Sequence, residues 1–180
     1  NREVVIIATT HQAVNNALNK INALDKNIPL IKIGELLKAD GLNERVIKIP
    51  KISNYNDNSR KNRKKKKYGY VVGMTIWGAI AHLGLRTHSH FRPYLALVDE
   101  ASLIPLTYAS VLGKCASSIC FMGDSRQMPP IFRTELESNA LSKSILDYCS
   151  KNVKGVPINI LPETHRMNRE ITQIVSKAFY

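Results

Sequence analysis

The chain has 180 residues, of which 44% are hydrophobic, so it is long enough and apolar enough to fold around a core of its own. No apolar run approaches the roughly 20 residues that a membrane-spanning helix needs, and no signal peptide is visible. The formal net charge is +12, from 26 basic against 14 acidic residues, which points to a polyanion as a binding partner.

Strands and helices are expected to alternate along the chain. The continuous apolar run from Val4 to Ala8 predicts a strand buried on both faces of a parallel sheet. Val14, Leu18 and Ile21 share one face of the helix that follows. The remaining expected elements, in chain order, are extended stretches at 30–33 and 46–49, a strand at 70–74, a helix at 76–83, a strand at 94–98, a helix at 106–112, a strand at 118–122, a helix at 141–149, a strand at 158–161 and a helix that begins after the N-cap Asn168. This alternation predicts an α/β fold with a mostly parallel sheet.

Residues 50–68 interrupt the alternation, because they are rich in Asn, Ser and Lys and almost devoid of apolar side chains. We expect a long surface loop or insertion there. Residues 60–67 within this segment hold seven basic residues, and the net charge without these seven is 12 − 7 = +5: Arg60, Lys61, Arg63, Lys64, Lys65, Lys66 and Lys67. Such a run is either a solvated loop that repels itself or a mobile contact for phosphates. Lys64 to Lys67 are therefore candidate nucleic-acid contacts.

Two adjacent carboxylates, Asp99 and Glu100, follow the strand predicted at 94–98. Ligands of open α/β sheets bind at the carboxyl ends of the strands. At such an edge Asp99 can hold Mg²⁺, and Glu100 can orient and activate an attacking water. Alone, the pattern also fits an acidic turn or a helix cap.

A second polar segment, Gly-Asp-Ser-Arg-Gln-Met-Pro-Pro at 123–130, follows the next predicted strand. Gly123 permits a tight exit from that strand, and the two prolines stiffen the loop. The amide of Gln127 both donates and accepts, so it can sense a terminal phosphate or the attacking water. By itself this segment also fits a plain turn before a rigid linker, but the two segments together are far more specific.

Together the two segments resemble motifs II and III of superfamily 1 helicases, most closely the branch of the RNA-surveillance helicase and the flap-processing nuclease-helicase. Three more segments fit that family in the same order. Residues 8–16 resemble motif Ia, 72–75 resemble motif Ic, and 161–168 resemble motif IV at the entry to a second RecA-like domain. The matching segments cover nearly the whole chain apart from residues 50–68.

The resemblance implies roles in binding and hydrolysing ATP. Asp99 would serve Mg²⁺, Glu100 would be the catalytic base, and Gln127 would sense the γ-phosphate. Arg166 would reach the phosphates like an arginine finger, since a guanidinium is permanently charged and pairs with phosphate oxygens. His165 stands where the family usually has tyrosine, so it would stack on adenine more weakly.

The resemblance also implies that Thr10, Asn15 and Thr75 lie toward the nucleic-acid backbone, where small hydroxyl and amide groups suit sequence-neutral contacts. Motif Ia departs from the family pattern, with Thr9 in place of proline and His11 in place of asparagine. In motif III, Met128 replaces leucine, a tolerable apolar exchange.

The expected fold is thus a RecA-like P-loop NTPase domain, α/β with a mostly parallel sheet, that lacks the Walker A strand and loop. No Gly-x-x-x-x-Gly-Lys-Ser/Thr run occurs in the chain. Residues 1–160 would form part of the first RecA-like domain, with the basic insertion at about 50–68. Residues 161–180 would carry motif IV and the start of the second domain. Family order places the phosphate loop before Asn1 and the rest of the second domain after Tyr180.

The expected function is ATP-dependent movement along single-stranded DNA or RNA, with 5′-to-3′ polarity implied by the branch. A non-enzymatic basic module that binds nucleic acid is one alternative, and a motor subunit of another P-loop ATPase or exonuclease complex is a second. Three cysteines without a Cys-x-x-Cys pair indicate reduced thiols in an intracellular protein. The isolated His88-x-His90 pair has no cluster of Cys or carboxylate residues beside it, as a metal site would need.

Overall fold

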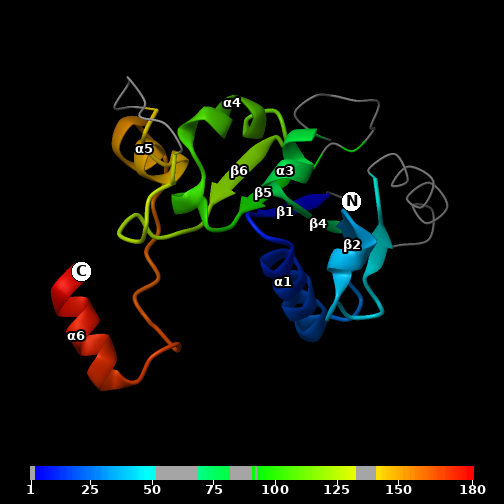
Figure 1. Ribbon diagram of the computed structural model, residues 1–180, viewed down its shortest axis with the longest axis horizontal. Helices are drawn as coiled ribbons and strands as arrows, with labels where there is room; N and C mark the ends of the chain where they lie inside the picture. The colour runs from blue at the N-terminus through cyan, green and yellow to red at the C-terminus, as the bar shows by residue number, and fades with distance from the viewer. Residues whose placement is uncertain (1–2, 52–68, 82–90, 92, 133–140) are drawn as a thin grey trace.

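The computed structural model describes residues 3–51, 69–81, 91, 93–132 and 141–180 (Figure 1). Its strands form one six-stranded sheet in the order β3-β2-β4-β1-β5-β6, and every neighbouring pair runs parallel. The strands are β1 Val4–Ala8, β2 Leu30–Ile33, β3 Ile47–Ile49, β4 Val71–Thr75, β5 Leu95–Val98 and β6 Ser118–Phe121. The predicted α/β fold with a parallel sheet is confirmed.

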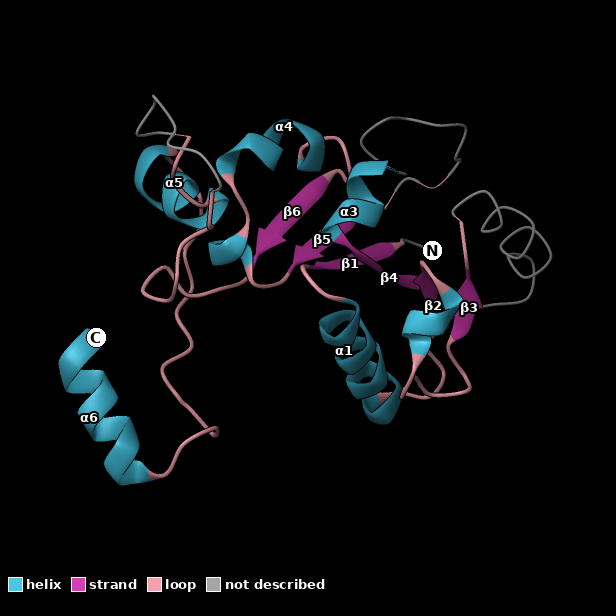
Figure 2. Ribbon diagram, in the orientation of Figure 1, coloured by secondary structure: helices cyan, strands magenta, loops and turns pink. Residues whose placement is uncertain are grey.

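Helices cover both faces of the sheet (Figures 1 and 2). The α-helices are α1 His11–Leu24, α3 Ile76–Ala79, α4 Ala109–Leu112, α5 Ile145–Asn152 and α6 Arg169–Phe179. Short 3₁₀ turns lie at η1 Leu36–Ala39, η3 Ala101–Leu103 and η4 Leu106–Tyr108. Helix α1 packs on one face, while α3 and α4 lie over the other (Figure 2). Among the described residues, no helix has the length and apolar character that a membrane span requires.

Each face of the sheet buries its own apolar cluster. Under α1, Val14 and Leu18 are fully buried against Ile6 and Leu30. On the opposite face, Val5 and Ile7 belong to a larger cluster that includes Ile104, Leu112 and Ile145. The two clusters explain the unbroken apolar run of β1, whose side chains alternate between two buried faces.

The chain changes direction across the sheet at β1. After β1 it passes through α1 to β2, which lies on the β4 side of β1. After β4 it crosses to β5 on the other side. Because crossovers between parallel strands are right-handed, connections that move in opposite directions cover opposite faces. The carboxyl ends of β1 and β5 are therefore adjacent, but the segments that follow them diverge and leave a crevice between them.

Close contact between α1 and β4 depends on Gly73. A Cβ atom at this position would lie 2.7 Å from Val14 Cγ1 and 2.8 Å from Leu18 Cδ1. Those separations are far inside van der Waals contact, so a larger residue would push α1 off the sheet. The glycine in the segment that resembles motif Ic thus has a packing role.

Side-chain caps mark the starts of α1, α3 and α6. Thr10 accepts from the Ala13 N–H at 3.1 Å, Thr75 from Gly78 at 3.2 Å, and Asn168 from Ile171 at 2.9 Å. Each cap satisfies one of the N–H groups that a first helical turn leaves without a partner. The N-cap predicted at Asn168 is confirmed.

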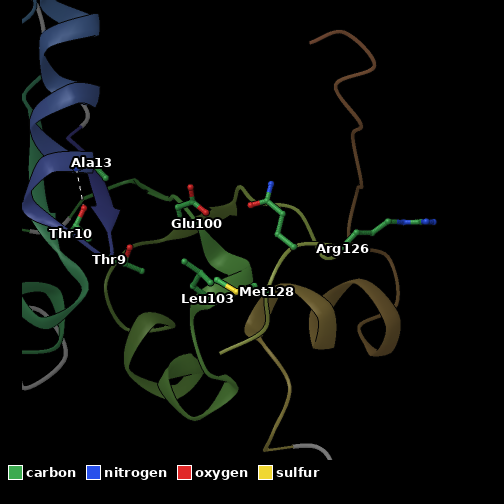
Figure 3. A pocket seen from close by; sticks show the side chains of 8 residues that line it. Thr9, Thr10, Ala13, Glu100, Leu103, Arg126 and Met128 are labelled. Atoms are coloured by element: carbon green, nitrogen blue, oxygen red, sulfur yellow. Dashed lines mark hydrogen bonds between the residues drawn. The ribbon is translucent and has the colours of Figure 1, made fainter. Parts of the chain in front are cut away.

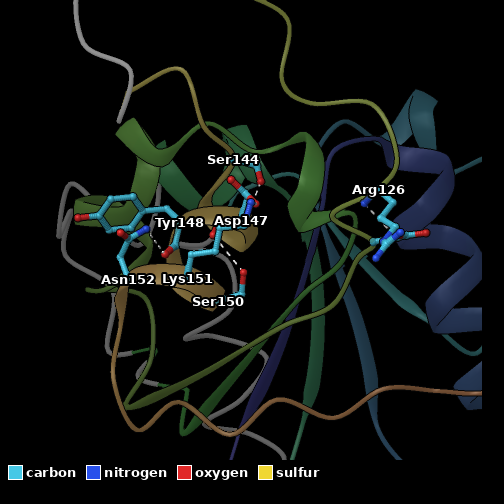
Figure 4. A network of polar contacts seen from close by, with 8 residues as sticks. Arg126, Ser144, Asp147, Tyr148, Ser150, Lys151 and Asn152 are labelled. Carbon is cyan, nitrogen blue, oxygen red and sulfur yellow. Dashed lines mark hydrogen bonds and ion pairs between the residues drawn. The ribbon is translucent and has the colours of Figure 1, made fainter. Parts of the chain in front are cut away.

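Helix α5 is held by local polar contacts along its length (Figure 4). Ser144 Oγ accepts from the Asp147 N–H at 3.0 Å, and Lys151 pairs with Asp147 at 2.6 Å one turn later. The helix was predicted at 141–149, but it begins only after Ser144 and runs to Asn152. The polar cap, rather than the apolar Leu141, determines its start.

The strand predicted at 158–161 is wrong, since this stretch has no regular structure. Its side chains are exposed, and Leu161 is 92% accessible. An extended segment becomes a strand only when its backbone pairs with a neighbour, and here the described part of the chain supplies none. The stretch leads to α6, which lies apart from the sheet in Figure 1. The helix predicted at 76–83 extends beyond the described residues, as does most of the loop predicted at 50–68.

A buried lysine joins α1 to the segment after β2. Lys32 is 2% exposed, and its Nζ donates to Asn15 Oδ1 and to the Lys38 carbonyl, both at 2.6 Å. Burial, with a contribution from nearby Lys48, lowers the pKa of Lys32. The Asn15 amide donates in turn to the carbonyls of Lys38 at 3.2 Å and Asp40 at 3.1 Å. Asn15 therefore joins three partners inside the domain.

This placement corrects the expectation that Asn15 lies toward nucleic acid. Its side chain is 2% exposed, and its oxygen and amide both bond inside the protein. A buried asparagine is tolerated only when its polar atoms are satisfied, and Lys32 and the 38–40 carbonyls meet that requirement. Asn15, in the segment that resembles motif Ia, thus stabilises the fold.

The network predicts a large difference between two neighbouring asparagines. Asn15→Ala should lower the free energy of unfolding by about 3 kcal/mol, because it leaves a buried cation and two carbonyls short of partners. The matched change Asn16→Ala removes only an exposed contact from Gln12 to Asn16 at 3.0 Å and should cost less than about 0.5 kcal/mol. Urea unfolding of both variants provides the measurement. Equal stability of the two would contradict the role given to Asn15.

Candidate functional site

A cavity of about 610 Å³, open to solvent, lies at the carboxyl ends of β1, β5 and β6 (Figure 3). Three connections contribute its lining residues: Thr9, Thr10 and Ala13; Glu100 and Leu103; Arg126, Gln127 and Met128. The cavity thus coincides with the crevice that the reversal of chain direction at β1 creates. This is where open α/β sheets bind their ligands. Two of the residues predicted for the site, Glu100 and Gln127, line this cavity together.

The β1 side of the cavity is the N-terminus of α1. Thr10 caps the helix through its side chain, and Thr9 precedes it. The first turn contains no acidic residue, so no side-chain carboxylate offsets the partial positive charge of the helix end there. A helix end of this kind attracts anions, and two hydroxyl groups flank it.

On the opposite side of the cavity, Glu100 is held in a strained backbone conformation. With φ 54° and ψ 39° it is the one non-glycine residue with positive φ in the described part of the chain. A left-handed conformation costs a non-glycine residue roughly 1–2 kcal/mol. The Glu100 N–H donates to Asp99 Oδ1 at 3.0 Å, and the Asp99 N–H donates to the Ile7 carbonyl at 2.8 Å. These bonds hold the turn that directs the Glu100 side chain into the cavity.

The third wall is the loop after β6, which Asp124 organises. Its Oδ1 accepts from the Arg126 N–H at 2.9 Å, and its carbonyl accepts from the Gln127 N–H at 3.1 Å. The Gln127 side-chain amide donates to Asp124 Oδ2 at 3.2 Å. Such a turn, built on an aspartate side chain, positions Gln127 at the cavity without burying it. The loop packs tightly on the β5 turn, because a Cβ at Gly123 would lie 3.1 Å from the Ala101 nitrogen.

Arg126 connects this loop to the end of the chain. Its guanidinium donates to the Phe179 carbonyl and lies over the Tyr180 ring, 5.4 Å from the centroid. The Tyr180 hydroxyl also donates to Asp124. In Figure 3 the Arg126 side chain extends away from Glu100 and Thr10. Its charge therefore contributes to the rim of the cavity rather than to its floor.

Several residues predicted for the site lie elsewhere. His165 and Arg166 are exposed in the segment before α6 and do not line the cavity. His165 Nε2 lies 4.0 Å from Glu163 Oε2, and the Arg166 N–H donates to Thr164 Oγ1 at 3.4 Å. Their predicted roles with ATP remain predictions. Lys64, Lys65, Lys66 and Lys67 lie outside the described residues.

Thr75 was expected to lie toward nucleic acid, but it is only 7% exposed. Its hydroxyl caps α3 by accepting from Gly78, as the Thr10 hydroxyl caps α1, but Thr75 is buried whereas Thr10 is exposed. A threonine at the end of a strand and the start of a helix fits this capping role equally well from the sequence. Of the three residues predicted to contact the backbone, Thr10 is the one that lies at the cavity.

Sequence reasoning missed several residues of the site, namely Thr9, Ala13, Leu103, Arg126, Met128 and the organising Asp124. An aspartate two residues before Arg126 was a usable signal, because aspartate side chains commonly accept from the N–H two residues on. Leu103 and Ala13 carried no signal, since their place depends on which strands are neighbours. Leu103 nevertheless supplies apolar surface at the cavity.

The described residues contain no group of three or more His, Cys, Asp or Glu that could hold a metal ion. Asp99 stands alone beside Glu100, and Mg²⁺ commonly uses one or two carboxylates together with phosphate oxygens. The donor set therefore fits Mg²⁺ only in the company of a phosphate ligand. The three cysteines are free, as expected for reduced thiols, and burial raises the pKa of Cys115 to about 11.

His11, in the first turn of α1, faces Gly34 and the buried lysine rather than the cavity. A Cβ at Gly34 would lie 3.0 Å from His11 Cε1, and the buried Nδ1 has no hydrogen-bond partner within the described structure. Burial lowers the pKa of His11, and the positive charges of Lys32 and Lys38 lower it further, while Glu35 opposes them. This environment disfavours the charged form of His11.

Comparison of the sequence with models of known protein families finds no family that matches, and a search of the curated proteins finds no relative. The function of the chain must therefore be inferred from its motifs and from the arrangement of this cavity.

The strain at Glu100 predicts an unequal response to two substitutions. Glu100→Gly should be more stable than Glu100→Ala by about 1 kcal/mol, because glycine adopts a left-handed conformation without a steric cost. Both variants lose the carboxylate, so the comparison isolates the backbone. Thermal unfolding at one pH measures the difference. If the alanine variant were as stable as the glycine variant, residue 100 would not be strained.

The environment of His11 predicts a loss of stability in mild acid. Because its pKa is lowered below 6.5 in the folded state, the unfolded chain takes up the proton first as the pH falls. The free energy of unfolding should therefore decrease as the pH falls below about 6.5. Urea unfolding of wild type and of His11→Gln isolates this effect. The measurements run from about pH 7.5 to about pH 5, a range that includes the ordinary pKa of histidine. A constant difference between the two proteins over this range would rule out the predicted linkage.

Proposed function

We propose that this chain is part of an ATP-dependent helicase or translocase of superfamily 1, with a RecA-like fold, that moves along single-stranded DNA or RNA. One observation carries the proposal. Glu100 and Gln127, from the ends of the neighbouring strands β5 and β6, line one cavity with the N-terminus of α1. Its volume of about 610 Å³ is within the usual range for small-molecule sites. On this proposal residues 1–160 belong to the first RecA-like domain and 161–180 begin the second.

In this proposal three residues of the chain act in ATP hydrolysis: Glu100, Gln127 and Asp99. Glu100 accepts the proton of the attacking water, and Gln127 orients that water by donating and accepting hydrogen bonds. Asp99, whose Oδ1 accepts from the Glu100 N–H, would hold Mg²⁺. When bound together with ATP, Mg²⁺ would neutralise negative charge on the β- and γ-phosphates. The strain at Glu100 supports an active-site role, because backbone strain clusters at functional sites.

The proposal requires a phosphate-binding loop that these 180 residues do not contain, because no Gly-x-x-x-x-Gly-Lys-Ser/Thr run is present. Arg166 and His165 act on the nucleotide only if the segment before α6 takes another position, since both lie away from the cavity. The longer protein would supply the loop and the remainder of the second domain.

The alternative, a non-enzymatic module that binds nucleic acid, is favoured by a different observation. The chain carries a net charge of +12, and the helix end at the cavity has two flanking hydroxyl groups and no acidic first turn. These features bind phosphates without any hydrolysis. The alternative gives Glu100 no task, and it leaves the strain at that residue unexplained.

Substitution of Glu100 separates the two proposals. In the full-length protein, Glu100→Gln should lower the rate of ATP hydrolysis by about 100-fold or more and leave the affinity for Mg·ATP nearly unchanged, because a base is lost while the metal ligand stays. The control Glu44→Gln changes an exposed carboxylate on another loop and should have no effect. Phosphate release and titration calorimetry are the measurements.

Hydrolysis at the wild-type rate in Glu100→Gln would exclude Glu100 as the base. A full-length protein that binds single strands but neither binds nor hydrolyses ATP would establish the non-enzymatic alternative. The 180-residue chain alone should show no hydrolysis and a dissociation constant for Mg·ATP of roughly millimolar or weaker, because the phosphate loop is missing.

A further inference from the structure

Trp77 is an exposed aromatic residue with no role in the site described above. It is the chain's single tryptophan, and its side chain is 62% exposed. Its neighbours in α3, Ile76 and Ala79, are buried beneath it at 4% and 0%. The short helix is therefore firmly packed and presents Trp77 outward. Tryptophan is strongly enriched at binding surfaces, because one rigid side chain supplies a large contact area.

The indole is not merely a loose surface group, because Tyr108 braces it. The two rings meet edge to face, with centroids 5.7 Å apart and an angle of 72° between their planes. Tyr108 lies in η4 and packs on the larger apolar cluster, so it connects Trp77 to the core. Edge-to-face pairs are favoured by the ring quadrupoles, and they restrict the side-chain rotamer. An ordered, exposed ring is already arranged to receive a flat ligand.

The pair stands at the same edge of the sheet as the cavity. Thr75, at the end of β4, is in register with Ala8, at the end of β1. Trp77 and Thr10 each lie two residues beyond those positions, where α3 and α1 turn to opposite faces of the sheet (Figures 1 and 2). The β4 end thus continues the row of strand ends that carries Thr10, Glu100 and Gln127. Trp77 therefore follows a strand end at the same edge of the sheet as the cavity, outside its lining.

Charge and shape together select the occupant. The net charge of +12 favours a polyanion, and an exposed indole favours a ligand with flat aromatic faces. Single-stranded nucleic acid combines both features, whereas a duplex hides the faces of its bases and a protein partner offers no reason for the basic charge. Stacking on an aromatic side chain tolerates any base sequence, as a translocating protein requires.

We infer that Trp77, braced by Tyr108, is a stacking platform for an unpaired base of single-stranded nucleic acid. The inference rests on the proposed function for the class of ligand, and it adds the residue and the mode of contact. Trp77 contacts a base face and so distinguishes single strands from duplex.

In the 180-residue chain the single tryptophan makes the test direct, because intrinsic emission reports Trp77 alone. The probes are oligothymidylate of about 12 nucleotides, an abasic strand of the same length, and a duplex. Oligothymidylate should quench the emission, while the abasic strand should bind, as fluorescence anisotropy measures, without quenching. The duplex should produce no quenching either.

Variants add a quantitative test in the same assay. Trp77→Ala should weaken binding of oligothymidylate roughly 5- to 100-fold and leave binding of the abasic strand unchanged. Trp77→Phe should restore most of the loss, and Tyr108→Ala should give a smaller loss than Trp77→Ala. Leu24→Ala removes another exposed apolar side chain, 86% accessible at the far end of α1, and should have no effect. Circular dichroism confirms that each variant is folded.

The outcomes separate this inference from the proposed function. If oligothymidylate binds equally to wild type and Trp77→Ala without quenching, Trp77 is not a stacking platform, although the protein still binds single strands. If no strand binds at all, the inference and the nucleic-acid part of the proposed function both fail, while the Glu100→Gln assay still tests ATP hydrolysis. Equal quenching by duplex would overturn the inference and indicate that Trp77 contacts a groove. Emission that changes with protein concentration alone would overturn it and indicate that Trp77 contacts a second copy of the chain.

Discussion

Parallel pairing of β1 with both β4 and β5 is the constraint on which the rest of the structure depends. Parallel strands cannot be joined by tight turns, so each connection must cross the sheet, and crossovers are right-handed. The chain leaves β1 in one direction and later crosses β1 in the other. This reversal sends α1 and α3 to opposite faces and opens the crevice between Thr10 and Glu100. The sheet topology thus determines where the cavity lies, and the side chains determine only what lines it.

Around that crevice, polar groups are held by partners within the fold. Lys32 and Asn15 attach α1 to the segment after β2, which keeps the capped end of α1 in place. On the other side, the Asp99 carboxylate secures the strained turn at Glu100. Buried polar networks that are fully satisfied make a structure rigid. Rigidity of both walls is what a preorganised site for phosphate chemistry requires.

The row of strand ends combines three kinds of surface. Thr10 contributes a hydroxyl group and a helix end, Glu100 contributes a strained carboxylate, and Trp77 contributes an aromatic face. These groups come from three adjacent strands of one rigid sheet. In the proposed motor, such closeness would place the site of ATP hydrolysis and the track of the nucleic acid on a single mechanical element. Movement of a second domain against that element would then affect both.

The sequence by itself determined the elements that depend on local pattern. The buried run at 4–8, the helix with Val14 and Leu18 on one face, and the N-cap Asn168 form where they were predicted. The local pattern also predicted Glu100 and Gln127 as site residues, because polar residues that follow buried strands can be recognised from the sequence. It failed at 158–161, where apolar residues predicted a strand, since strand formation depends on a neighbour that a local pattern cannot supply.

Only the tertiary structure decided which polar residues face the cavity. Asn15 and Thr75 were indistinguishable from Thr10 in the sequence, yet Asn15 meets a buried lysine from β2 and Thr75 caps α3 inside the fold. Leu103 and Ala13 became neighbours of Glu100 because β1 and β5 are adjacent in the sheet. Strand order depends on long-range pairing, whose free energy is spread over many residues. For that reason motif spacing predicted two residues that line the cavity, Glu100 and Gln127, while the identity of the residues that surround them required the fold.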